Sequence, residues 1–139
     1  MVKERARILV VGGGYVGMYT ALRLQRKLKR ELGRGEAEIM VVTPDPYMTY
    51  QPFLPEAAAG AISPRHVVVP LRRVLDRCHI VIGEATGVDH AARTATVRTL
   101  ATEEEGTGGL RIAYDELVLA PGSVARRSWW PPASSIFRA

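Results

Sequence analysis

Cysteine is almost absent from this chain of 139 residues, in which Cys78 is the only one. A single cysteine excludes an intramolecular disulfide, and the C-x-x-C pair that dithiol redox chemistry needs is missing. Because Cys78 lies between two apolar stretches, we expect it to be a small packing residue rather than a reactive thiol.

Long apolar runs are also absent. No stretch approaches the ~20 apolar residues that span a bilayer, so we expect no transmembrane segment. No signal-peptide pattern precedes the first apolar run, and the resulting expectation is a cytoplasmic location.

Candidate catalytic and metal-binding groups are few. His66, His79 and His90 are isolated, with neither the spacing of metal ligands nor an evident triad partner. No other side chain stands out as an acid, base or nucleophile. The sequence therefore predicts no metal site and no catalytic residue.

Aromatic residues make up only 6% of the chain, and acidic residues are outnumbered, with 14 Asp and Glu against 19 Lys and Arg. A net charge of +5 raises the question of nucleic-acid binding. Much of the positive charge lies on one side of the first predicted helix and after residue 125, without the interleaved aromatic residues of an RNA-binding surface. We therefore expect no nucleic-acid partner.

What the chain does have is a hydrophobic strand that runs directly into a glycine fingerprint. The strand covers residues 6–11, and the pattern G-x-G-x-x-G follows in Gly12-Gly13-Gly14-Tyr15-Val16-Gly17. In such a turn the first glycine allows the tight bend, the second admits a pyrophosphate close to the backbone, and the third lets the helix pack closely. The helix N-terminus then offers N–H groups to the phosphates. The sequence predicts an adenine dinucleotide site here.

The segment after the fingerprint has the periodicity of an amphipathic helix. At 100° per residue an apolar stripe forms on one side, and basic residues fall on the other. The stripe consists of Gly17, Ala21, Leu24, Leu28 and Leu32, and the basic side of Arg23, Arg26, Lys27 and Arg30.

Further strands are expected along the chain. Residues 37–43 read as a second buried strand, which completes a βαβ unit with parallel strands. Residues 47–60 read as irregular with a short helix near 56–59, and residues 70–77 as a helix that begins at a proline. Strands are also expected at 79–83, 94–99, 110–114 and 116–120, with the acidic run 103–105 at a hairpin tip. The predicted fold class is α/β, a Rossmann-like βαβ unit followed by a small antiparallel β-meander.

At this point the chain resembles a known family. It is similar to the N-terminal part of FAD-dependent pyridine-nucleotide oxidoreductases, type II NADH:quinone oxidoreductases above all. The similarity lies in the glycine fingerprint, in the segment 47–60 that contains Tyr50-Gln51-Pro52, and in the closing Leu117-Val118-Leu119-Ala120-Pro121-Gly122. The resemblance covers residues 6 to about 124. It implies FAD as cofactor, NAD(P)H as hydride donor and a quinone-like electron acceptor.

The resemblance also implies roles for particular residues. Gly12, Gly14 and Gly17, within the fingerprint that includes Gly13, Tyr15 and Val16, would hold the FAD pyrophosphate. Gln51 and Pro52 would lie near the isoalloxazine, and Ala85 near the adenine. The last strand would close the site through Ala120, Pro121 and Gly122.

Two features depart from the family. The second strand ends at Thr43, where such sites usually carry an acidic residue for the ribose, and Asp45 follows across Pro44. Either Thr43 or Asp45 would hold the ribose. The second departure is the missing NAD(P)H domain, since two domains need roughly 300 residues. We therefore expect an incomplete FAD-binding domain over residues 1–125 and an irregular tail over 126–139, with a reading frame that ends or shifts near residue 125.

Other functions stay in competition with this one. One is a non-catalytic fragment that binds a dinucleotide and turns nothing over. Another is a small NAD(P)-dependent dehydrogenase, which would need a Tyr/Lys or His/Asp set that is not evident here. The sequence leaves open whether the chain forms a homo-oligomer.

Overall fold

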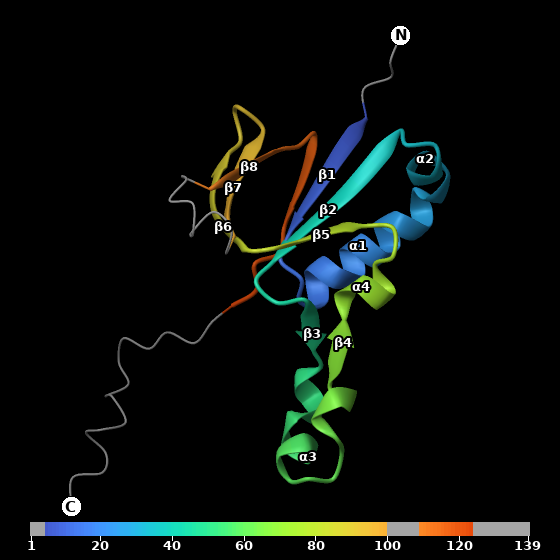
Figure 1. The fold of residues 1–139 in the computed structure, drawn as a ribbon, viewed down its shortest axis with the longest axis vertical. Helices are drawn as coiled ribbons and strands as arrows, with labels where there is room; N and C mark the ends of the chain where they lie inside the picture. The colour runs from blue at the N-terminus through green and yellow to red at the C-terminus, as the bar shows by residue number, and fades with distance from the viewer. Residues whose placement is uncertain (1–4, 100–108, 124–139) are drawn as a thin grey trace, which may run out of the picture.

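A parallel β-sheet forms the centre of the molecule. The computed structural model describes residues 5–99 and 109–123, so the predicted hairpin tip 103–105 and the tail 126–139 lie outside the described residues. The sheet contains β1 (Ala6–Val11), β2 (Ala37–Thr43), β5 (His79–Ile82) and β9 (Glu116–Leu119) in the order β5-β2-β1-β9 (Figure 1). Every neighbouring pair is parallel. The predicted α/β class and the βαβ unit are confirmed.

The two central strands are apolar on both faces because both faces are covered. On one face Val10, Ile39 and Val41 pack with the helices in a cluster that includes Met18, Ala21, Leu71 and Leu75. On the other face Leu9 and Val42 pack against the meander through Ala95, Val97, Ile112 and Tyr114. The continuous apolar runs of β1 and β2 are what a sheet covered on both faces requires.

The helix after the fingerprint follows the predicted stripe. It is divided into α1 (Tyr15–Lys27) and α2 (Lys29–Gly33), with Leu28 between them at φ −94° and ψ 23°. Gly17 and Ala21 are buried and Leu24, Leu28 and Leu32 partly buried, while the predicted basic side is exposed. The stripe is confirmed, and the single helix expected is interrupted by a non-helical residue.

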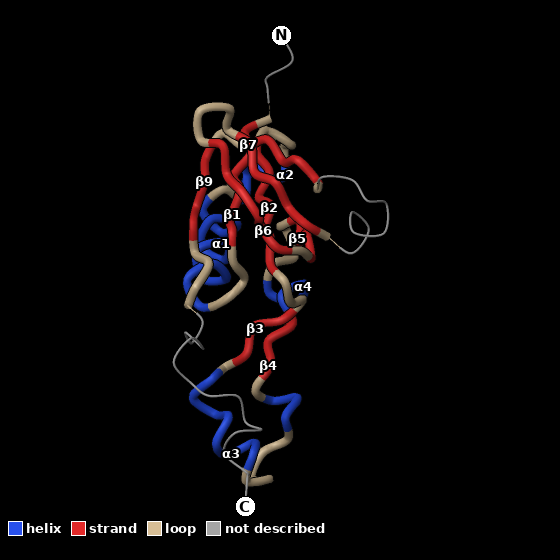
Figure 2. The backbone as a smooth tube through the Cα atoms, turned by 90° about the vertical axis from the view of Figure 1, so that its left-hand side faces the viewer, coloured by secondary structure: helices blue, strands red, loops and turns tan. Residues whose placement is uncertain are grey.

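Between β2 and β5, residues 44–78 extend away from the sheet and form a segment that we call the excursion (Figures 1 and 2). Residues 47–60 were expected to be irregular, yet β3 (Tyr47–Thr49) pairs antiparallel with β4 (Val68–Pro70). At the far end lie η1 (Gln51–Phe53), α3 (Leu54–Ala58) and η2 (Pro64–His66). The helix expected over residues 70–77 is a single turn, α4 (Leu71–Val74), because Leu75 leaves the helical region at φ −111° and ψ 54°.

The meander packs on the sheet face opposite α1. Its strands are β6 (Glu84–Asp89), β7 (Thr94–Arg98) and β8 (Leu110–Ala113), paired antiparallel in that order. The antiparallel meander is confirmed, whereas β6 was not predicted because its residues are mostly exposed and show no apolar alternation. The chain then returns to β9 beside β1.

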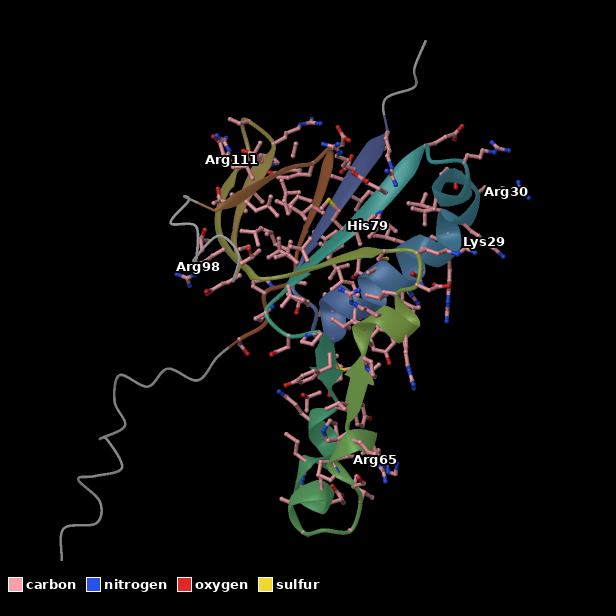
Figure 3. All side chains as sticks on the ribbon, viewed as in Figure 1. Lys29, Arg30, Arg65, His79, Arg98 and Arg111 are labelled. Atoms are coloured by element: carbon pink, nitrogen blue, oxygen red, sulfur yellow. The ribbon has the colours of Figure 1, made fainter. Side chains whose placement is uncertain are left out.

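Within the described part of the chain, basic residues lie on several separate elements. Figure 3 shows Lys29 and Arg30 on α2, Arg65 on the excursion and Arg98 and Arg111 on the meander. Among the described residues, no helix has the length and apolar character needed to cross a bilayer.

Candidate functional site

A cavity of about 240 Å³ opens where β1, β2 and β9 end. In parallel α/β sheets, ligands bind in the crevice outside the carboxyl ends of the strands. Most of the residues predicted to bind a cofactor line this cavity, namely Gly12, Gly13, Gly14, Tyr15, Thr43, Asp45, Gln51, Ala120, Pro121 and Gly122. The structure therefore brings together residues from four separate parts of the sequence.

Pro44, Tyr47, Met48 and Thr49 also line the cavity, although no individual role was predicted for them. They directly follow the carboxyl end of the second strand. Their place in the sequence, directly after the end of the second strand, could have identified them. The chain that leaves the carboxyl end of this strand must pass the cavity, because ligands of parallel sheets bind at that end.

Gly12 makes the bend from β1 toward the helix. Its φ is +109°, and a Cβ added there would lie 1.9 Å from the carbonyl oxygen of Ala120. The turn is fixed on both sides, since the Gly12 N–H donates to the Val42 carbonyl at 2.8 Å and the Ala120 N–H to the Val11 carbonyl at 2.8 Å. Only glycine fits this position.

Gly13 and Gly17 are needed for packing. A Cβ on Gly13 would lie 2.5 Å from Thr43 Oγ1, and a Cβ on Gly17 would lie 1.8 Å from the Gly12 carbonyl oxygen. Gly17 therefore sets the approach of the helix to the glycine turn itself, in addition to its place over Val10.

Gly14 is different because no contact with the described residues requires a glycine at this position. Its φ is −76°, and a Cβ would meet no atom within 4 Å. Gly14 lines the cavity and is the N-cap residue of α1. The backbone at Gly14 is therefore not covered by a side chain, and a ligand in the cavity can approach it closely.

The N-terminus of α1 faces the same region. No side chain caps it, and its first turn contains no acidic residue. A helix N-terminus of this kind favours negative charge through its N–H groups and its dipole. Val16, in the fingerprint, does not line the cavity and is exposed.

Thr43 and Asp45 differ in whether their side chains are free to accept a hydrogen bond from a ligand. Thr43 is buried, and its hydroxyl donates to the Asp45 carbonyl oxygen at 3.2 Å, which places that proton within the turn. Asp45 is exposed and is the one charged residue among the described residues that line the cavity. The Asp45 carboxylate is thus the stronger acceptor on this wall.

Gln51 and Pro52 lie in η1, just after β3 in the far part of the excursion. Gln51 lines the cavity, and its backbone N–H donates to the Tyr15 hydroxyl at 3.0 Å. Pro52 is beside it but is not part of the lining. Ala85 lies in β6, where it packs with the apolar cluster between sheet and meander, away from the cavity lining.

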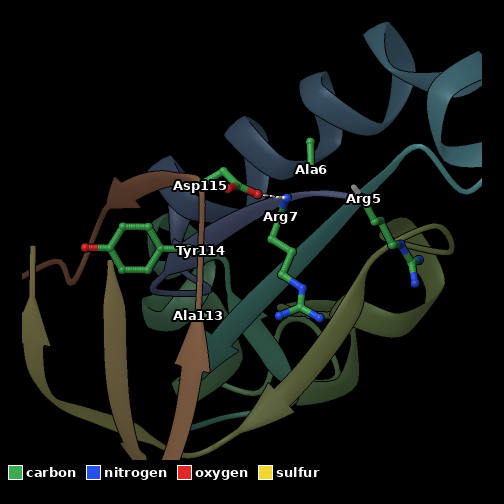
Figure 4. A pocket seen from close by; sticks show the side chains of 6 residues that line it. All are labelled: Arg5, Ala6, Arg7, Ala113, Tyr114 and Asp115. Carbon is green, nitrogen blue, oxygen red and sulfur yellow. Dashed lines mark hydrogen bonds between the residues drawn. The ribbon is translucent and has the colours of Figure 1, made fainter. Parts of the chain in front are cut away.

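Larger cavities occur at the opposite end of the sheet. One of about 460 Å³ is lined by Arg5, Ala6, Arg7, Ala113, Tyr114 and Asp115 (Figure 4). There the Arg7 N–H donates to the Asp115 carboxylate at 2.7 Å, and the Asp115 N–H donates to the Arg7 carbonyl. These bonds fix the start of β9 beside β1, so we assign this region a structural role, because ligands of such sheets bind at the other end.

Cys78 has the environment of a packing residue. Its thiol lies 3.5 Å from the Oε1 atom of Gln25, a buried amide that also donates to the Val74 carbonyl at 2.7 Å. Burial, and secondarily the charge of Asp76, raises the pKa of the Cys78 thiol to about 11.

We expect Cys78 in the native protein to react with iodoacetamide at pH 8 roughly a hundredfold more slowly than a cysteine of ordinary pKa, because the thiolate is the reactive form. The measurement is the alkylation rate in buffer and in denaturant, followed by mass spectrometry. Equal rates in the two conditions would contradict a protected thiol.

The fold and the cavity define a nucleotide-binding class of α/β protein, in which a glycine turn and a helix N-terminus meet at the carboxyl end of a parallel sheet. The family model described as pyridine nucleotide-disulphide oxidoreductase matches residues 6–135. The chain belongs to this family.

Individual relatives agree with that assignment. The type II NADH:quinone oxidoreductase of Staphylococcus aureus is 34% identical over 95 residues, which cover 67% of this chain and 23% of that protein. The structure of the sulfide:quinone oxidoreductase from Aquifex aeolicus is 27% identical in sequence, with a TM-score of 0.68. The match covers 84% of this chain and 24% of the Aquifex chain. NDH2 from Plasmodium falciparum, solved in complex with NADH, shares the fold with a TM-score of 0.69 at 19% sequence identity. The match covers 87% of this chain and 23% of the NDH2 chain. The chain thus spans about a quarter of the length of these relatives.

Proposed function

We propose that this chain is the FAD-binding part of an NAD(P)H oxidoreductase that passes a hydride from NAD(P)H to flavin and electrons to a quinone-like acceptor. The observation that carries the proposal is the cavity at the glycine turn, with its bare Gly14 and its uncapped helix N-terminus. Among the described residues, those that line the cavity include no Lys or Arg, so phosphates would be held there by backbone N–H groups and the helix dipole.

The residues present fit an adenine dinucleotide. The free space over Gly14 is what close approach of a pyrophosphate needs, and Asp45 supplies an acceptor for ribose hydroxyls. A volume of about 240 Å³ is just below the ~300–1,000 Å³ of sites that enclose a whole ligand. The cavity is therefore suited to the diphosphate and the adjoining ribose, with the rest of the cofactor extending beyond it.

When bound, FAD would supply the redox chemistry, which protein groups cannot perform by themselves. The residues of this chain would bind and orient it. Gly12 shapes the turn, Gly14 admits the diphosphate, and the N-terminus of α1 neutralises part of its charge. Ala120, Pro121 and Gly122 close the cavity from the β9 side, and Gln51 lies at its edge toward the excursion.

Between the two candidates for the ribose, we propose Asp45. The Asp45→Asn variant is expected to bind FAD and ADP about tenfold more weakly, because a charge-assisted hydrogen bond becomes a neutral one. Its stability is expected to be unchanged, since Asp45 is exposed. The measurement is the Kd of each ligand by calorimetric titration.

The matched control for this variant is Glu56→Gln, which neutralises an exposed carboxylate of α3 outside the cavity. Its FAD and ADP affinities are expected to equal those of the wild type. If Asp45→Asn binds as tightly as Glu56→Gln, Asp45 does not hold the ribose.

A second candidate function is a dinucleotide-binding chain without turnover. The observation that favours it is that every role assigned above to a described residue of the cavity is one of binding or of shaping the turn. The cavity and its residues are the same in both functions, so the difference lies in whether NAD(P)H reaches the flavin.

One experiment separates the two functions. The chain is loaded with FAD, its visible spectrum is recorded anaerobically, and NADH or NADPH is added. Bleaching of the flavin absorbance supports the oxidoreductase function of this chain. A bound flavin spectrum that stays oxidised supports binding without turnover. The absence of any bound flavin would contradict the oxidoreductase function, and the absence of ADP binding as well would contradict both functions.

A further inference from the structure

The far part of the excursion, residues 50–66, is connected to the body of the protein by few interactions. Its backbone hydrogen bonds are internal or reach the adjoining β4 side, as when the Tyr50 N–H donates to the Val67 carbonyl at 2.6 Å. Within the described part of the chain, one hydrogen bond joins this segment to the glycine turn and α1. It is the bond from the Gln51 N–H to the Tyr15 hydroxyl, at 3.0 Å.

Aromatic contacts reinforce that hydrogen bond. The rings of Tyr15 and Tyr50 lie 6.1 Å apart at 58°, and the rings of Tyr50 and Phe53 lie 5.0 Å apart at 67°. Both distances are within the range of favourable aromatic pairs. Tyr15, Tyr50 and Phe53 are all more than a third exposed, so this contact is an open junction rather than part of the hydrophobic core.

Tyr15 is placed to connect two parts of the cavity wall. It is the first residue of α1, directly after Gly14, and both Tyr15 and Gln51 line the cavity. Its backbone belongs to the glycine turn, while its hydroxyl holds the first residue of η1. Tyr15 therefore joins the glycine turn to the start of η1 through this hydrogen bond.

We propose that Tyr15 is a positioning residue, which holds Gln51 at the cavity edge and so selects for a dinucleotide that extends past the diphosphate. This inference rests on the proposed function, in which the flavin half of FAD lies toward Gln51 and the ADP half lies over the glycine turn and Asp45. The hydroxyl of Tyr15 then contributes to binding of FAD and not of ADP.

The test is the Tyr15→Phe variant of the full chain, which keeps the ring contacts and removes the acceptor for Gln51. Its FAD affinity is expected to fall about threefold to tenfold, the range of one hydrogen bond, while its ADP affinity stays at the wild-type value. Tyr19→Phe is the matched control, since Tyr19 is exposed one turn along the same helix and outside the cavity lining. Both ligands are expected to bind it as they bind the wild type.

Amide hydrogen exchange at Gln51, measured without ligand, tests the same bond independently. Exchange is expected to be faster in Tyr15→Phe than in the wild type and unchanged in Tyr19→Phe. Equal losses of FAD and ADP affinity, or no loss of either, would overturn the positioning role. Failure of the proposed function has a different signature, because the wild type itself would then bind neither ligand.

Discussion

The Gly14→Val variant is expected to lose FAD and ADP binding, by roughly a hundredfold or more, and to keep its fold. A valine side chain would occupy the free space over Gly14 and block the approach of a diphosphate to the backbone. The fold should tolerate it, because φ is −76° and an added Cβ meets no atom within 4 Å. A stability change of about 1 kcal/mol or less is expected for valine at a helix N-cap.

The measurements are calorimetric titration with each ligand and denaturant unfolding without ligand. Gly33→Val is the matched control, because Gly33 lies at the end of α2 with equally open space around it and outside the cavity lining. Retained affinity in Gly14→Val, in a variant as stable as the control, would contradict the assignment of Gly14 to the diphosphate.

The Gly17→Ala variant is expected to destabilise the fold by about 3 kcal/mol, the upper end of the usual penalty for overpacking. Its Cβ would lie 1.8 Å from the Gly12 carbonyl oxygen, so backbone would have to move. Alanine normally stabilises a helix relative to glycine, so the sign of the effect is opposite to that of helix propensity. A Tm about 6 to 12 °C lower is the corresponding shift, measured by thermal unfolding without ligand.

Gly33→Ala provides the comparison for this variant. An alanine there meets no atom within 4 Å, and its stability is expected to equal or slightly exceed that of the wild type. A Gly17→Ala protein as stable as Gly33→Ala would contradict the close approach of α1 to the glycine turn.

The parts of the fold that could be predicted are those with local signals. β1 and β2 are apolar runs, α1 has a stripe, and Gly12 ends a strand, so periodicity and one glycine pattern placed the βαβ unit. The meander was also predicted, although β6 was not, since its mostly exposed residues lack an apolar pattern.

The parts that could not be predicted depend on partners distant in the sequence. β3 and β4 are three-residue strands that exist because they pair with each other. The bond between Tyr15 and Gln51 joins residues 36 positions apart, and nothing in either local sequence specifies it. Similarly, the sequence could not separate Thr43 from Asp45, because the answer depends on a turn that directs the Thr43 hydroxyl to the Asp45 carbonyl.

The central claim is that the cavity at Gly14 holds the diphosphate of an adenine dinucleotide. Its most direct test is a calorimetric titration of FAD into the full chain, repeated in the presence of ADP. We predict one FAD per chain and competition by ADP, because both ligands place a diphosphate at the same glycine turn. A titration in which neither FAD nor ADP binds would contradict the claim.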